Sequence, residues 1–154
     1  MLVVALVLLA IMALVGLNAM RAVSLEERMA GHTYDRSLSF QAAESALREA
    51  EILVAANRPE PAVCDDGVCP APLPTDTPRW LDATFAGWQS ASTVSNAGVD
   101  ITPQYLIEYL GNTFECEPGS PSTTADCKRY RITARSNAGA DRSAVMVQSL
   151  YATD

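Results

Sequence analysis

The chain has 154 residues, of which 49% are hydrophobic and 19% charged, and its formal net charge is -7. This size accommodates one small globular head in addition to a membrane anchor. The acidic balance argues against nucleic acid as a partner.

The first 20 residues form an uncharged apolar segment, MLVVALVLLAIMALVGLNAM. At about 1.5 Å per residue, a helix of this length spans roughly 30 Å, the thickness of the hydrocarbon core of a bilayer. A small soluble fold cannot surround a helix that is apolar on every side. We therefore expect residues 1–20 to cross a membrane or to pack against the same helix of other subunits. No basic region precedes Met1, so we expect that a basic leader has been removed there, although a trimmed chain would look the same.

An amphipathic pattern continues the helix through residues 21–57. Apolar side chains recur along one face at spacings of three and four residues. They are Ala22, Leu25, Met29, Phe40, Ala43, Leu47, Ala50 and Val54. We expect this face to pack on a core from Phe40 onward, with Leu47 and Ala50 buried, and the part before Phe40 to form a stalk. Asn57 tolerates a left-handed helix end and Pro59 cannot continue the helix, so the helix should end there.

All four cysteines lie in residues 58–154, which we expect to form the globular head. An even number of cysteines in an exported head indicates disulfides. Three pairings are possible, and we favour the local one, which joins Cys64 to Cys69 and Cys116 to Cys127. A four-cysteine zinc site is the alternative, but the CxxC pairs usual for structural zinc are absent, so we expect no metal.

The first part of the head is rich in proline and predicts an irregular surface segment. Thr77 and Pro78 then predict the start of a small helix. The side chains that would share one side of this helix are Trp80, Leu81, Thr84, Phe85 and Trp88. We expect the two tryptophans to cover one edge of the core; an exposed patch that binds a partner is the alternative.

In the last third of the chain the hydrophobic period switches to two, which predicts half-buried strands. One strand contains Ile107 and a second contains Ile132. A third strand, from about residue 142 to 151, follows a turn at residues 136–141. These strands predict an antiparallel meander against residues 40–54 of the helix, and thus an α+β fold with one long helix packed on one antiparallel β-sheet.

No pattern of catalytic or cofactor-binding residues occurs in the sequence, and we expect no enzyme activity and no cofactor. The single histidine, His32, has no second base or nucleophile near it, and phosphate-loop, HExxH and GxSxG motifs are absent. Asp65, Asp66 and Asp126 offer oxygen ligands to calcium, but their spacing matches no EF-hand, which favours a solvated turn. One strand face carries a basic row, which we expect to be solvated rather than to contact a partner's acids. Its members are Arg129, Arg131 and Arg135.

Both ends of the chain resemble a known family. LVVALVLLAIMALVGLNAM followed by LEERMAGHTYDRSLSFQAAESALREAE resembles the PilX-type minor pilins of type IV pili. CKRYRITARSNAGADRSAVMVQSLYA resembles the last hairpin of that family. The resemblance covers roughly half the chain and leaves residues 58–98 without a counterpart. It implies the type IV pilin fold.

The resemblance also implies a life history and partners. The precursor would be a single-pass inner-membrane protein with its head in the periplasm. Prepilin peptidase would remove its leader, and the new first residue, here Met1, would be N-methylated. The mature subunit would prime pilus assembly and sit at the tip of the cell-surface pilus. Its partners would be other minor pilins, the major pilin and a tip adhesin, in a filament that serves cell adhesion and twitching motility.

Two residues of the first segment bear on assembly in this family. Ala5 stands where most pilins carry a glutamate, and the first carboxylate of the chain is at Glu26. Gly16 lowers helix stability by about 1 kcal/mol relative to alanine, so the helix can loosen there or approach a neighbour closely. Two other classes remain open from the residues. One is a bitopic inner-membrane protein with a periplasmic scaffold or sensor head, and the other is a minor pseudopilin of a type II secretion system.

Overall fold

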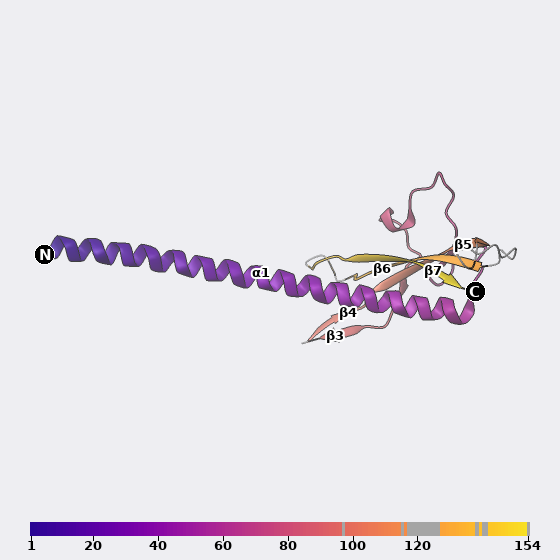
Figure 1. Cartoon of the computed structure of the whole chain (residues 1–154), viewed down its shortest axis with the longest axis horizontal. Coiled ribbons are helices and arrows are strands. Elements are labelled where there is room, and N and C mark those ends of the chain that lie inside the picture. The colour runs from indigo at the N-terminus through magenta and orange to yellow at the C-terminus, as the bar shows by residue number, and fades with distance from the viewer. Residues whose placement is uncertain (97, 115, 117–126, 138, 140–141, 154) are drawn as a thin grey trace. The chain divides into compact units, whose positions relative to one another are not determined.

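The computed structural model of the chain describes residues 1–96, 98–114, 116, 127–137, 139 and 142–153. It contains two compact units, Met1–Asp35 and Arg36–Asp154. Helix α1 spans Leu2–Asn57 and contributes to both units (Figure 1). Its first part is long and apolar enough to cross a membrane, and the apolar side chains there are exposed. The long N-terminal helix expected from the composition is confirmed.

The second unit contains a mixed five-stranded sheet in the order β1-β5-β6-β7, with β2 also paired to β5. Strands β5 (Gln104–Phe114), β6 (Cys127–Arg135) and β7 (Met146–Thr153) form an antiparallel meander beside α1 (Figure 1). This confirms the predicted meander, although β7 begins four residues later than expected. Strands β1 (Val68–Pro70), parallel to β5, and β2 (Gln89–Ser90) were not predicted, because two or three residues carry no readable period.

A separate hairpin of β3 (Val94–Asn96) and β4 (Val99–Ile101) packs on α1 at Leu38. Packing of the helix therefore begins at Leu38, and the expected burial of Phe40 is wrong, since that side chain is 49% exposed. Phe40 shares its helix face with residues four and eight positions later, Glu44 and Arg48, and that face is turned away from the core.

The main core lies between α1 and one face of the sheet. Its fully or largely buried members are Ala46, Leu47, Ala50, Val54, Ala91, Tyr105, Ile107, Tyr130, Ile132 and Ala134. The expected burial of Leu47 and Ala50 is confirmed. Alanine supplies three of the four buried α1 side chains between Ala43 and Ala50, and these small side chains let the helix backbone approach the aromatic rings of the strands closely.

Helix α1 ends at Asn57, but Arg58 rather than Asn57 adopts the left-handed conformation, with φ of 45°. The N–H of Arg58 donates to the carbonyl of Val54 at 2.9 Å, which satisfies one of the free carbonyls of the last turn. The hydroxyl of Tyr130 donates to the carbonyl of Pro59 at 3.0 Å. The core strand β6 thus holds the chain directly after the helix.

Leu47→Ala is expected to lower the free energy of unfolding by roughly 2–5 kcal/mol, because it removes a buried side chain and leaves a cavity. Glu44→Ala, on the neighbouring half-exposed face, should change it by less than about 1 kcal/mol. Thermal or denaturant unfolding of the full chain in detergent measures both. Equal losses in the two variants would place the packed face elsewhere.

The head should lose stability at alkaline pH through Tyr130. Burial raises the pKa of its hydroxyl to about 12, with smaller contributions from Tyr109 and Glu60 and an opposing one from Arg58. Because the folded pKa exceeds the unfolded value of about 10, the contribution is complete below pH 10 and is lost as pH rises through 12. Unfolding free energies should fall by about 2 kcal/mol between pH 10 and 12. Tyr130→Phe should flatten this slope, and an unchanged slope would contradict the assignment.

Candidate functional site

The sheet face turned away from α1 is covered by residues 71–88, called here the cover segment. The apolar contacts between this segment and the sheet involve Cys69, Trp80, Phe85, Trp88 and Leu106. Leu106 and Glu108 lie on this second face of β5 and are fully buried. The half-buried pattern predicted for the strand is therefore wrong at its centre, whereas the expectation that the tryptophans cover the core is confirmed.

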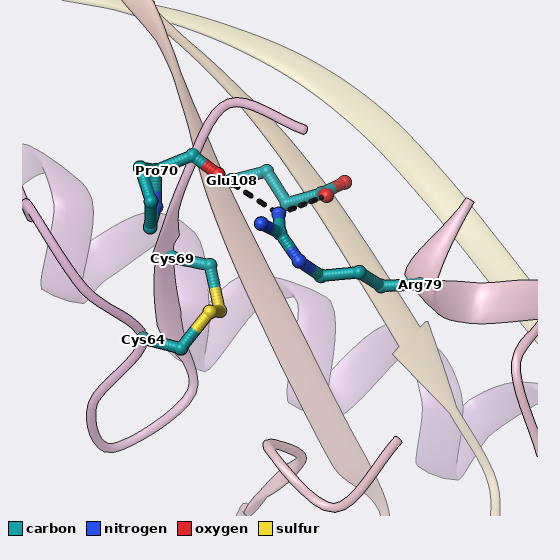
Figure 2. Close-up of a disulfide and its surroundings, with 5 residues drawn as sticks. All are labelled: Cys64, Cys69, Pro70, Arg79 and Glu108. Carbon is teal, nitrogen blue, oxygen red and sulfur yellow. Dashed lines mark hydrogen bonds and ion pairs between the residues drawn. A yellow bond between two sulfur atoms is a disulfide. The ribbon is translucent and has the colours of Figure 1, made fainter. Parts of the chain in front are cut away.

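A buried carboxylate, Glu108, joins the cover segment to the sheet. Arg79 Nη1 donates to Glu108 Oε1 at 2.7 Å, and Arg131 Nε donates to Glu108 Oε2 at 2.9 Å. Arg79 Nη1 also donates to the carbonyl of Pro70 in β1 at 2.8 Å, as Figure 2 shows. An unpaired carboxylate at this depth would be strongly destabilising, so the burial of Glu108 depends on both guanidinium groups.

The basic row of β6 lies against aromatic rings, and its predicted solvation is wrong. The pairs are Arg129 over Phe114 at 4.7 Å, Arg131 over Trp80 at 4.3 Å and Arg135 over Trp88 at 4.1 Å. Arg135 Nε and Nη2 also donate to Gln104 Oε1 at 2.9 and 2.6 Å, and burial lowers the pKa of this guanidinium. These cation–π contacts occupy the faces of the guanidinium groups that solvent would otherwise reach. The row serves the fold rather than presenting free charge.

A disulfide and a tight turn set the start of the cover segment. Asp66 and Gly67 have φ of 43° and 77°, the type I′ conformation of a two-residue hairpin loop. A Cβ at Gly67 would collide with the Cβ of Gln89, so glycine is required there both for its φ and for space. Cys64 and Cys69 are joined across this turn (Figure 2). Cys116 and Cys127 are also joined, so both bonds of the favoured local pairing are present.

The predicted small helix after Thr77 is a single 3₁₀ turn, η1 (Arg79–Leu81), and Thr77 does not cap it. The carboxylate of Asp82 accepts hydrogen bonds from the N–H and hydroxyl of Thr84 at 2.8 and 2.6 Å. This local turn competes with helix formation and redirects the chain. The hydrogen bonds from Thr84 also lower the pKa of the Asp82 carboxyl.

The comparison with protein-family models decides the family. Residues 64–153 match the model described as type IV pilus assembly protein PilX C-term, and residues 1–48 match the PilX N-terminal model. The chain belongs to the PilX family. No curated protein and no solved structure is significantly similar to it. PilX proteins are structural components of type IV pili, and the α+β layout of this chain is consistent with the pilin fold.

The remaining residues singled out in this PilX chain are not brought together by the structure. Ala5, Gly16 and His32 lie on exposed parts of α1, and Met1 is exposed directly before the helix. Space for a Cβ is open at Gly16. The processing and assembly roles expected of these residues stay predictions.

Of the candidate calcium ligands, Asp65 and Asp66 belong to the exposed turn before β1, and Asp126 lies outside the described residues. Within the part of the chain that the structure describes, no group of three or more histidine, cysteine, aspartate or glutamate side chains is placed to hold a metal ion.

Sequence reasoning missed Glu108 as the centre of the PilX head. The available signal was a charged residue in the middle of an otherwise apolar strand, opposite Arg131 in an antiparallel pair. Opposite charges on facing strand positions stabilise a sheet, so the pairing of Glu108 with Arg131 could have been predicted. The pairing with Arg79 could not, because Arg79 lies 29 residues away along the chain in a segment without a period.

Glu108→Ala is expected to destabilise the head by about 3–5 kcal/mol, because it leaves two guanidinium groups at the contact between the cover segment and the sheet without their carboxylate. A matched control is the exposed pair between Lys128 and Glu60, where Glu60→Ala should cost less than about 1 kcal/mol. Unfolding followed by tryptophan fluorescence measures both variants. A loss at Glu108 no greater than that at Glu60 would show that the buried pair does not hold the cover.

Proposed function

We propose that this PilX-family protein is a minor pilin that primes assembly of a type IV pilus and remains at the filament tip. The supporting observation is in the apolar segment: the first 25 residues contain no aspartate or glutamate. In most pilins, a glutamate near the start of this helix is thought to neutralise the terminal amine of a neighbouring subunit. Residues 1–25 offer no carboxylate for this purpose.

The energetic consequence favours a terminal position. An amine buried among apolar helices without a carboxylate costs several kcal/mol. A subunit that lacks the acid therefore leaves a neighbour's amine unpaired if it is placed within the shaft. At the end of the filament no earlier subunit needs that partner, so the tip is the position with the smallest cost. A subunit confined to the tip is present in few copies and is incorporated first.

Membrane storage fits the same proposal. Residues 1–20 would remain in the inner membrane, with the head in the periplasm, until they enter the filament core. The apolar surface is then covered by lipid before assembly and by neighbouring helices after it, so its burial is kept throughout. The partners in this proposal are other minor pilins, the major pilin and a tip adhesin.

Immunogold labelling tests the location. Antibody against the head should mark filament ends, while antibody against the major pilin on the same grids should mark the shaft. Gold particles for the head spaced along the shaft would contradict the proposal.

A deletion strain tests the priming role. Removal of the gene should leave few surface pili, because initiation is slow without the protein. A second deletion that blocks retraction should restore part of the piliation, since rare filaments then persist. Normal piliation in the single deletion strain would show that the protein does not prime assembly.

A further inference from the structure

Strand β7 forms a free edge of the head sheet. It is last in the strand order and pairs only with β6 within the part of the chain that the structure describes. The N–H of Ser136 donates to the carbonyl of Val145, which continues the register of the β6–β7 pair and makes these two residues a hydrogen-bonded pair. Bonding alternates along an antiparallel pair, so every second residue of β7 directs its N–H and C=O away from β6. These residues are Met146, Gln148, Leu150 and Ala152.

The β7 edge lacks the features that usually prevent strand addition. Protected edges are short, bulged, or carry charged residues or proline. The eight residues of β7, MVQSLYAT, include neither a charge nor a proline, and their pairing with β6 runs without a bulge. The opposite side of the sheet differs: β1 has three residues and ends in Pro70. The side chain of Leu150 is also 72% exposed.

A groove runs between this edge and the last turns of α1. One section, of about 320 Å³, is lined by Arg48, Glu51, Ile52, Ala55 and Tyr151. The adjoining section, of about 150 Å³, shares Ala55 and Tyr151 and adds Arg58, Ala152 and Thr153. Ile52 is 70% exposed although it faces this groove. Beside β7, the sheet therefore leaves uncovered a flank of its helix that carries both apolar and charged side chains.

We propose that the β7 edge accepts an extended segment of another protein, which adds a strand to the sheet. Main-chain hydrogen bonds to the outward residues of β7 would hold the segment, as in other cases of strand addition. Alternate side chains, those on the side of α1, would be apolar and would pack on Ile52 and Ala55, and the side chains between them would lie beside Leu150 on the other face. Arg48, Arg58 and Glu51 are the charged residues that line the two sections of the groove, and Glu51 already accepts a hydrogen bond from Ser149. The balance is basic, so the flanks of the segment would be acidic rather than basic.

A second copy of this chain is the alternative occupant of the edge. Two copies joined through β7 would pair antiparallel about a two-fold axis, and the parts of α1 inside the two heads, residues 36–57, would run in opposite directions. The crosslinking experiment below detects that arrangement. The inference concerns the head alone and does not require a position at the pilus tip.

Photo-crosslinking of the full chain in living cells tests the proposal. With Met146→p-benzoylphenylalanine, irradiation should join β7 to another protein, and mass spectrometry should map the crosslink to a segment with alternating apolar residues and acidic flanks. A matched position is Leu81, which is 70% exposed but lies on the cover segment, and it should give no crosslink to that segment. Crosslinks to a second copy, to lipid only, or to the same segment from both positions would overturn the proposal.

Backbone variants then separate strand addition from side-chain contact. Leu150→Pro removes an outward N–H, whereas Leu150→Ala removes the same side chain and keeps the N–H. The proline variant should reduce the Met146 crosslink about tenfold or more, and the alanine variant by less than about threefold, with unchanged melting of the head. If the proline variant fails to fold, Leu150→Lys, which leaves every N–H in place, should give the same loss. Equal crosslinking in all three variants would rule out strand addition.

Discussion

The paired carboxylate of Glu108 is the interaction on which the outer half of the head depends. It lies in the central strand β5, and its two oxygens accept from Arg79 of the cover segment and Arg131 of β6. Each guanidinium group is further fixed, Arg79 by the carbonyl of Pro70 and Arg131 by the ring of Trp80. A single buried charge thus holds three segments together. Charge-assisted hydrogen bonds of this kind are strongly directional. They therefore fix the position of the irregular cover segment on the sheet and also hold it there.

The other half of the head depends on ordinary apolar packing. Small alanine side chains of α1 face the rings of Tyr105 and Tyr130, and the core cluster to which they belong contains no charged side chain among the described residues. That cluster needs only the spacing of apolar residues on helix and strand, which is a local property of the sequence. The two faces of one sheet are therefore stabilised by different means: hydrophobic burial on the side of α1, and a buried ion pair with stacked arginines on the side of the cover segment.

This difference explains what the sequence could predict. The long helix, the three long strands and the local disulfides follow from composition, period and spacing, and all are present. The fate of the cover segment could not be predicted in the same way. The strands on either side of it, β1 and β2, are only three and two residues long, and a local Asx turn at Asp82 replaces the expected helix. Arg79 and Glu108 are 29 residues apart in the sequence. The burial of Phe40 was predicted wrongly because Phe40 keeps the three-residue spacing to Ala43. That spacing does not distinguish the buried face of the helix from the exposed face beside it.

The arrangement also separates positions that must be kept from positions that are free to vary. The cover segment is held at the disulfide between Cys64 and Cys69, at Arg79 and at Trp88, and between these points it exposes side chains such as Leu73 and Leu81. Substitution of those exposed residues leaves the ion pair and both core layers intact. The surface over the outer face of the sheet can therefore change while the fold is retained. The free edge of β7 lies outside the cover segment, and its backbone groups do not depend on which side chains that segment carries. Main-chain recognition at this edge requires only an extended partner with a suitable alternation of side chains.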